Sequence, residues 1–81
     1  MRVISQDGTM DFPYENSVVF INPRDMSTVR IAAIGENGDG MIAKYSTGKR
    51  ALNAMKMLRN EFAEHGERGF FQFPQGDEIE V

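Results

Sequence analysis

Apolar and polar residues alternate with a period of about two along residues 1–45, which is typical of β-strands. Each apolar stretch ends at a turn signal that contains Gly, Pro, Asn or Asp, such as Asp7-Gly8. The stretches themselves are rich in Val, Ile, Phe and Thr, which suit the pleated surface of a sheet. The pattern therefore predicts strands at residues 2–5, 9–12, 17–21, 27–34 and 41–45.

A glycine-rich loop at residues 35–40 separates the last two of these strands. It contains an Asn-Gly and an Asp-Gly dipeptide, which both favour tight turns between antiparallel strands, so we expect a hairpin here. In the strand that follows, the period of two places Met41, Ala43 and Tyr45 on one face.

The apolar period changes to about 3.6 after residue 47, which predicts one amphipathic helix over residues 48–64. Ser46 or Thr47 is the expected N-cap, because a hydroxyl can accept from the free amides of the first turn. Gly66 is placed for a left-handed C-cap. The apolar stripe consists of Ala51, Met55, Leu58 and Phe62, widened by Leu52, Ala54 and Ala63.

The aromatic segment at residues 69–74 predicts a last short strand. Its alternation places Phe71 and Phe73 on one face and Phe70 and Gln72 on the other. One helix can cover one face of a small sheet, as in two-layer α+β domains. We therefore predict an α+β fold: an antiparallel β-meander of four to six strands, one amphipathic helix packed on one face, and a short C-terminal strand.

Length and composition narrow the classes of protein that are compatible with this fold. A chain of 81 residues supports one hydrophobic core, which we assign to residues 1–75, and we expect the acidic tail at residues 76–81 to be frayed. The absence of Cys excludes disulfide scaffolds, thiolate metal sites and cysteine nucleophiles. The net charge of −3 disfavours a dedicated nucleic-acid binder.

The hydropathy of the chain also predicts where the protein acts. The apolar run near the N-terminus is two residues long, Val3-Ile4, which is too short for an export signal. No stretch approaches the roughly 20 apolar residues that a membrane-spanning helix needs. We therefore expect a cytoplasmic protein with no membrane partner.

Three segments of the chain carry a resemblance to a known family. They are the opening residues 2–8 with Asp11 and Pro13-Tyr14-Glu15, the middle residues Tyr45-Ser46-Thr47, Lys49, Ala51, Ala54-Met55 and Met57-Leu58-Arg59, and the aromatic segment Phe71-Gln72-Phe73-Pro74. Together they resemble a family of small uncharacterised proteins encoded by Gram-positive, gut-type bacteria and by their phages or mobile elements. Many members are longer between the helix and the final strand. The resemblance implies a genomic context and brings no activity, cofactor or catalytic residue with it.

The residues that could carry chemistry do not form a recognisable catalytic or metal-binding pattern. Asp7, Asp11 and Glu15 are spread over a hairpin and a turn, whereas acid–base pairs need a shared pocket. His65 is the one histidine, and with neighbouring Glu61 it falls short of the three or four ligands of a transition-metal site. We therefore predict no enzyme, no metal and no cofactor.

Two functional hypotheses remain, and the first is a protein-interaction or assembly module that forms a homo-oligomer or binds another protein. Strands 17–21 and 29–34 carry apolar residues on both faces, whereas one helix covers one face. The partner surface is expected on the uncovered sheet face or edge, with Tyr14 and Phe70 as candidate anchors, because aromatic residues dominate interface energetics.

The second hypothesis is weak binding of an anion or a nucleic acid by the basic half of the helix. Lys49 and Lys56 lie roughly 20° apart around a helix axis, and Arg59 lies about one turn further on. These three cations and the helix N-terminus would attract a phosphate or an acidic partner. The alternative is a solvated helix face whose charge is balanced by the acids that follow it.

Overall fold

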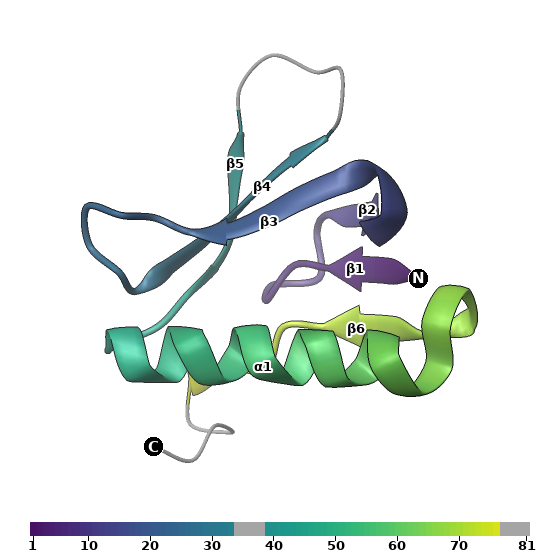
Figure 1. Ribbon diagram of the computed structural model, residues 1–81. Coiled ribbons are helices and arrows are strands. Elements are labelled where there is room, and N and C mark those ends of the chain that lie inside the picture. Colours follow the sequence, from purple (N-terminus) through teal and green to yellow (C-terminus); the bar gives the residue numbers. More distant parts are fainter. Residues whose placement is uncertain (34–38, 77–81) are drawn as a thin grey trace.

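The computed structural model describes residues 1–33 and 39–76, and it confirms the α+β class (Figure 1). The expected hairpin loop and acidic tail therefore lie largely outside the described residues. The elements are β1 (Arg2–Ile4), β2 (Asp11–Pro13), the 3-10 turn η1 (Tyr14–Asn16), β3 (Ser17–Ile21), β4 (Thr28–Ala33), β5 (Gly40–Lys44), α1 (Gly48–His65), the 3-10 turn η2 (Gly66–Arg68) and β6 (Phe70–Gln72).

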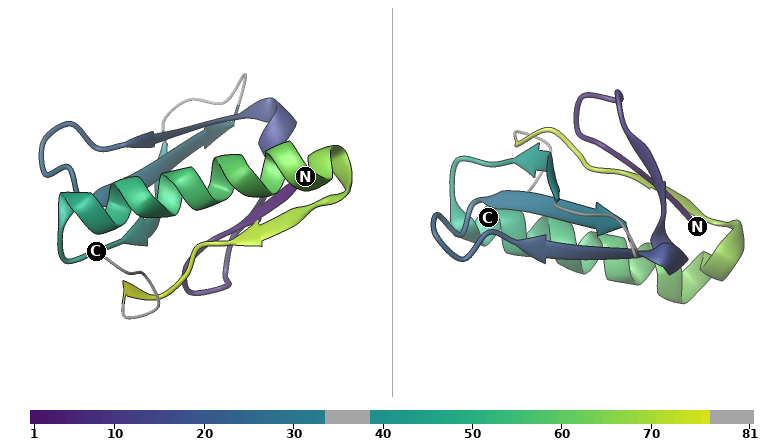
Figure 2. Two further views of the ribbon diagram at one scale, coloured as in Figure 1. Left: turned by 60° about the horizontal axis from the view of Figure 1, so that its bottom comes forward. Right: turned by 90° about the horizontal axis from the view of Figure 1, so that it is seen from above.

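The strands form two small sheets rather than one. β3, β4 and β5 form an antiparallel meander in that order, as expected. The second sheet has the order β2-β1-β6, in which β1 pairs antiparallel with β2 and parallel with β6. Parallel neighbours need a long crossover, and the chain from β1 through α1 provides it. In the left view of Figure 2, α1 runs in front of both sheets along their junction.

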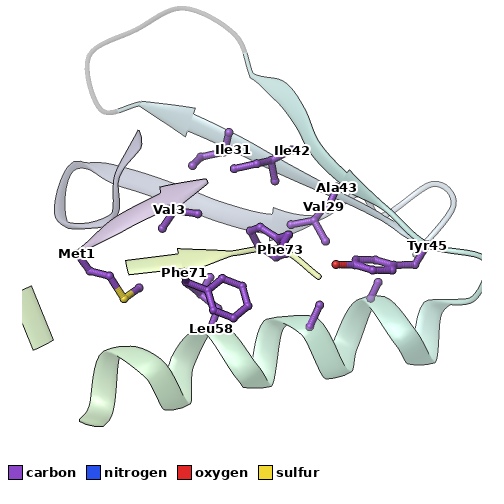
Figure 3. Close-up of a cluster of buried hydrophobic side chains, with 12 residues drawn as sticks. Met1, Val3, Val29, Ile31, Ile42, Ala43, Tyr45, Leu58, Phe71 and Phe73 are labelled. Carbon is purple, nitrogen blue, oxygen red and sulfur yellow. The ribbon is translucent and has the colours of Figure 1, made fainter. Parts of the chain in front are cut away.

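The core lies between α1 and the inner faces of the two sheets, where side chains from both sheets point towards the helix (Figure 3). The edge of the Phe71 ring meets Phe73, with ring centres 5.1 Å apart. Leu58, at the centre of the helix stripe, is 1 % exposed. The buried cluster comprises Met1, Val3, Val29, Ile31, Ile42, Ala43, Tyr45, Ala51, Ala54, Leu58, Phe71 and Phe73.

The buried stripe of α1 is narrower than the sequence pattern indicates. Ala51, Ala54 and Leu58 are buried, whereas Leu52 is 45 % exposed and Ala63 is also exposed. Successive helix residues are about 100° apart, so a residue beside the stripe is buried only where a neighbouring element reaches around the helix. The prediction that Leu52 and Ala63 widen the buried stripe was therefore wrong.

A β-bulge in β5 changes which of its side chains face the core. Val29 pairs with Ala43 and Arg30 pairs with Met41, which leaves Ile42 as an extra residue between the two pairs. Ile42 and Ala43 are each 2 % exposed, whereas Met41 is 50 % exposed. The expectation that Met41 shares a face with Ala43 and Tyr45 was wrong, because the bulge breaks the period of two.

The two ends of α1 have the expected capping residues. The Thr47 Oγ1 accepts a hydrogen bond from the amide of Arg50 at 3.2 Å, so Thr47 is the N-cap. Gly66 has a φ of 58°, as a left-handed cap requires, but its ψ of −138° lies outside the left-handed helical region. That conformation is open essentially to glycine alone, and it directs the chain into η2. The cap differs from the expected form in ψ, although glycine is required in either case.

Gln6 connects the two sheets by using every polar group that it has. Its amide donates to the carbonyl of Ile42 at 2.9 Å, and its Oε1 accepts from the amide of Lys44 at 3.0 Å. Its Nε2 donates to the carbonyl of Pro74 at 3.1 Å, and its own carbonyl accepts from Gln75 Nε2 at 2.9 Å. One residue thus joins the end of β1 to the edge of β5 and to the segment after β6.

We expect Gln6→Ala to lower the free energy of unfolding by about 1–3 kcal/mol, because it leaves the amide of Lys44 without a partner and removes one of the two donors to the carbonyl of Pro74, which keeps its hydrogen bond from the Tyr45 hydroxyl. Hydrogen exchange at the Lys44 amide should become faster. Gln72→Ala is the matched control, since Gln72 is exposed and donates one long hydrogen bond of 3.4 Å to Ser5. If urea unfolding showed that the two variants lose the same free energy of unfolding, the role of Gln6 would be contradicted.

Candidate interaction surfaces

Asp7 organises the turn between β1 and β2. Its Oδ1 accepts from the hydroxyls of Thr9 and Ser5, each at 2.7 Å, and from the amide of Thr9 at 3.0 Å. These hydrogen bonds, those of Thr9 first, lower the pKa of Asp7 to about 2. Gly8 completes the turn with a φ of 78°. Asp7 is thus a turn residue that is held in its charged form.

The other two N-terminal carboxylates also have their own partners. Asp11 accepts from Arg2 Nε at 2.8 Å, on the exposed side of the β1–β2 pair. Glu15 accepts from the ammonium group of Met1, and this hydrogen bond lowers the pKa of Glu15. Asp7, Asp11 and Glu15 therefore each bind different partners, and the structure does not bring them together in one pocket.

In the described part of the chain, one histidine–carboxylate pair and two small hollows are candidates for a ligand site. His65 Nδ1 pairs with Glu61 on the same helix, and no cluster of three potential metal ligands occurs within residues 1–33 and 39–76. Hollows of about 70 and 230 Å³ lie on either side of Gln6. Both are below the roughly 300–1,000 Å³ that small-molecule sites occupy.

The face of the β3-β4-β5 sheet that is turned away from α1 is partly apolar. Val18 pairs with Ala32, and in the next row Arg30 lies between Phe20 and Met41. Val18 and Met41 are 54 % and 50 % exposed, and Phe20 and Ala32 are partly exposed. We call these five residues the outer face. Aromatic residues, Met and Arg are the types that are enriched in protein–protein interfaces.

The charge at the centre of the outer face is neutralised within the chain. Arg30 Nε donates to Asp39 Oδ2 at 2.7 Å, and Arg30 Nη2 donates to the Asp39 carbonyl at 3.3 Å. This pairing raises the pKa of Arg30 and lowers the pKa of Asp39. Because both side chains are about one third exposed or less, the pair leaves the outer face polar at one point and uncharged overall.

The two edges of the β3-β4-β5 sheet differ in how they are covered. Gln6 occupies the edge of β5, where it pairs with Ile42 and Lys44 as a neighbouring strand would. β3 is the other edge strand, and no further strand pairs with it in the described part of the chain. The outer face therefore ends at an open strand edge.

The two predicted aromatic anchors lie at opposite edges of the β2-β1-β6 sheet. Tyr14 follows β2 and is half-buried, and its ring contacts Phe62 of α1 with ring centres 5.1 Å apart. Phe70, at the start of β6, is 67 % exposed. Pro13 and Phe70 flank Arg2 from the two sides, so one strand separates the anchors. The structure does not bring them together, and Phe70 is the more accessible of the two.

The three predicted anion-binding residues are accessible on the helix. Lys49, Lys56 and Arg59 are all exposed, and none of them forms an ion pair within the described residues. Arg50 is separate from them, because its Nη1 donates to the carbonyl of Gly76 at 2.9 Å. The first turn of α1 contains no acid, although acids are favoured at that end of a helix dipole.

Sequence reasoning missed the contribution of Gln6 and part of the outer face. Alternation along residues 17–21 is enough to place Val18 and Phe20 on one face. Met41 joins them through the bulge in β5, and no local signal in the sequence marks that bulge. Gln6 likewise follows an ordinary strand, and its partners are distant in sequence.

Within the described residues, no helix has the length and apolar character needed to cross a bilayer.

The pKa of Asp7 gives a test of the turn. Because the pKa in the folded protein is about 2 and the ordinary value is 3.8, charged Asp7 stabilises the fold above about pH 4, and this contribution is lost as the pH falls towards 2. The stability advantage of the wild type over Asp7→Asn should therefore shrink over that window in urea unfolding. A carboxyl titration of Asp7 by NMR with a midpoint at or above 3.8 would contradict the hydrogen-bonded turn.

Comparison with known proteins found no protein similar to this chain. No protein-family model matches the chain, and no curated protein or solved structure matches it either.

Proposed function

We propose that this chain is a small non-catalytic assembly module that binds protein through the uncovered side of its β3-β4-β5 sheet. The contact region comprises the outer face and the open edge of β3, and the partner is a second copy of the chain. A cytoplasmic site of action is part of the proposal. So is an origin in Gram-positive bacteria or in their phages and mobile elements, which the sequence resemblance suggests.

The observation that carries this proposal is the exposure of large apolar side chains beside an open strand edge. Val18 and Met41 are each exposed for about half of their surface, and Phe20, which follows Val18 on the same face of β3, is not among the residues that pack on the buried cluster. Covering such side chains removes apolar area from water at about 25 cal/mol per Å². A small domain gains stability in this way when its own core is limited.

We expect wild-type protein to show a mass that rises from monomer to dimer with concentration in size-exclusion chromatography with light scattering. Phe20→Lys should shift this transition to at least about tenfold higher concentration, because it places a charge in the apolar contact. Phe20 is not part of the buried cluster, so the variant should remain folded by circular dichroism.

Leu52→Lys is the matched control, since Leu52 is 45 % exposed on α1 and lies away from the outer face. Phe70→Lys tests the remaining predicted anchor on the other sheet. A wild-type protein that stays monomeric at all concentrations would overturn the proposal. An equal loss of association in Phe20→Lys and Leu52→Lys would overturn the assignment to the outer face.

A second candidate function is anion binding by the exposed cations Lys49, Lys56 and Arg59. The observation that favours it is that the three exposed cations form no ion pair within the described residues, and Lys49 also lies in the first turn of α1, where the helix dipole is positive. We expect the triple change to Glu to abolish a salt-sensitive shift of duplex DNA in a native gel at low salt. The absence of any shift with wild-type protein would end this interpretation.

A further inference from the structure

β3 differs from the other edge strands in having no protection against pairing. β2 carries Asp11 and Pro13, and a charge and a proline are both common ways of blocking an edge. β6 is three residues long, and the edge of β5 is covered by Gln6. β3 has five residues, with no charge and no proline. Of the described edge strands, β3 is the one best suited to pair with another strand.

The hydrogen-bond pattern shows which backbone groups of β3 are free. The amide of Asn22 donates to the carbonyl of Thr28, directly opposite, at 2.8 Å. Because hydrogen-bonded and non-hydrogen-bonded pairs alternate in an antiparallel ladder, Phe20 also faces β4 with its amide and carbonyl. Val19 and Ile21 therefore direct theirs outward, where no described residue bonds to them.

We infer that two copies of the chain pair antiparallel through β3, with the two-fold axis at Phe20. This inference rests on the proposed self-association. In this register Val19 lies opposite Ile21 of the second copy, and each such pair exchanges two hydrogen bonds. The free amide and carbonyl of both residues are then satisfied in both copies, and the result is a continuous six-stranded antiparallel sheet.

The neighbouring register, with the axis at Val19, satisfies fewer groups. It would place Ile21 opposite Ser17 of the second copy, whose amide already donates to the carbonyl of Tyr14, the first residue of η1. The carbonyl of Ile21 would then have no donor. The free donors and acceptors of β3 thus match one another about Phe20, which is why we assign the partner as a second copy.

Side chains support the same register. Phe20 faces Phe20 of the second copy on the outer face, in a close non-hydrogen-bonded pair with Cα atoms about 4.5 Å apart. Aromatic pairs across strands are among the favourable ones. On the inner face, Val19 and Ile21, which both pack against the core, continue the apolar layer from one copy to the next.

Single cysteines test the register directly, because the natural chain contains no Cys. We expect Phe20→Cys to form a disulfide dimer on mild oxidation, since its Cα separation suits that bond. Val18→Cys is the matched control: it lies on the same face, but its two copies would be about 13 Å apart along the strands. Phe20→Cys should therefore cross-link at least about tenfold faster than Val18→Cys.

Hydrogen exchange of the unmodified protein gives a second readout. Protection of the Val19 and Ile21 amides should rise with protein concentration, whereas Phe20, already bonded within the sheet, should change little. Suppose that light scattering shows association. The β3 pairing alone would then be overturned if Val18→Cys cross-linked faster than Phe20→Cys, or if the amides of Val19 and Ile21 gained no protection. A protein that remains monomeric would overturn self-association itself.

Discussion

The four hydrogen bonds of Gln6 determine how the two halves of this small protein fit together. They add to the core, to the chain that runs from β2 through η1 into β3, and to the hydrogen bond from the Tyr45 hydroxyl to the carbonyl of Pro74. The same interaction covers the edge of β5. Gln6 therefore both joins the two sheets and covers the edge of β5. Among the described residues, no strand pairs with the opposite edge, at β3.

Local patterns in the sequence were sufficient for the elements. The strand at residues 17–21 and the helix from Gly48 were predicted at the positions that the structure confirms, because each has a clear period and a clear boundary. Thr47 and Gly66 marked the helix ends for the same reason, since capping depends on residues near in sequence. Alternation alone correctly placed Phe71 and Phe73 on one face, and the structure shows that this face is buried.

The arrangement of the elements could not be predicted in the same way. Nothing near Ile42 in the sequence indicates the bulge, which depends on how β5 meets β4 and the core. The parallel partnership of β1 and β6 joins segments from opposite ends of the chain. The candidate surface was predictable as a face of the sheet, whereas the difference between the open edge of β3 and the covered edge of β5 depends on the strand order and on the distant residue Gln6.

The unequal edges of the β3-β4-β5 sheet bear on the size to which an assembly can grow. A sheet that is open on both sides can add strands indefinitely, which leads to fibres. Here one side is already closed by a side chain of the same molecule, so a pair joined through β3 presents Gln6 at both of its ends. If the chain pairs through β3 as proposed, the covered edge of β5 would stop the addition of further strands and limit the assembly to two copies, although β3 carries no charge.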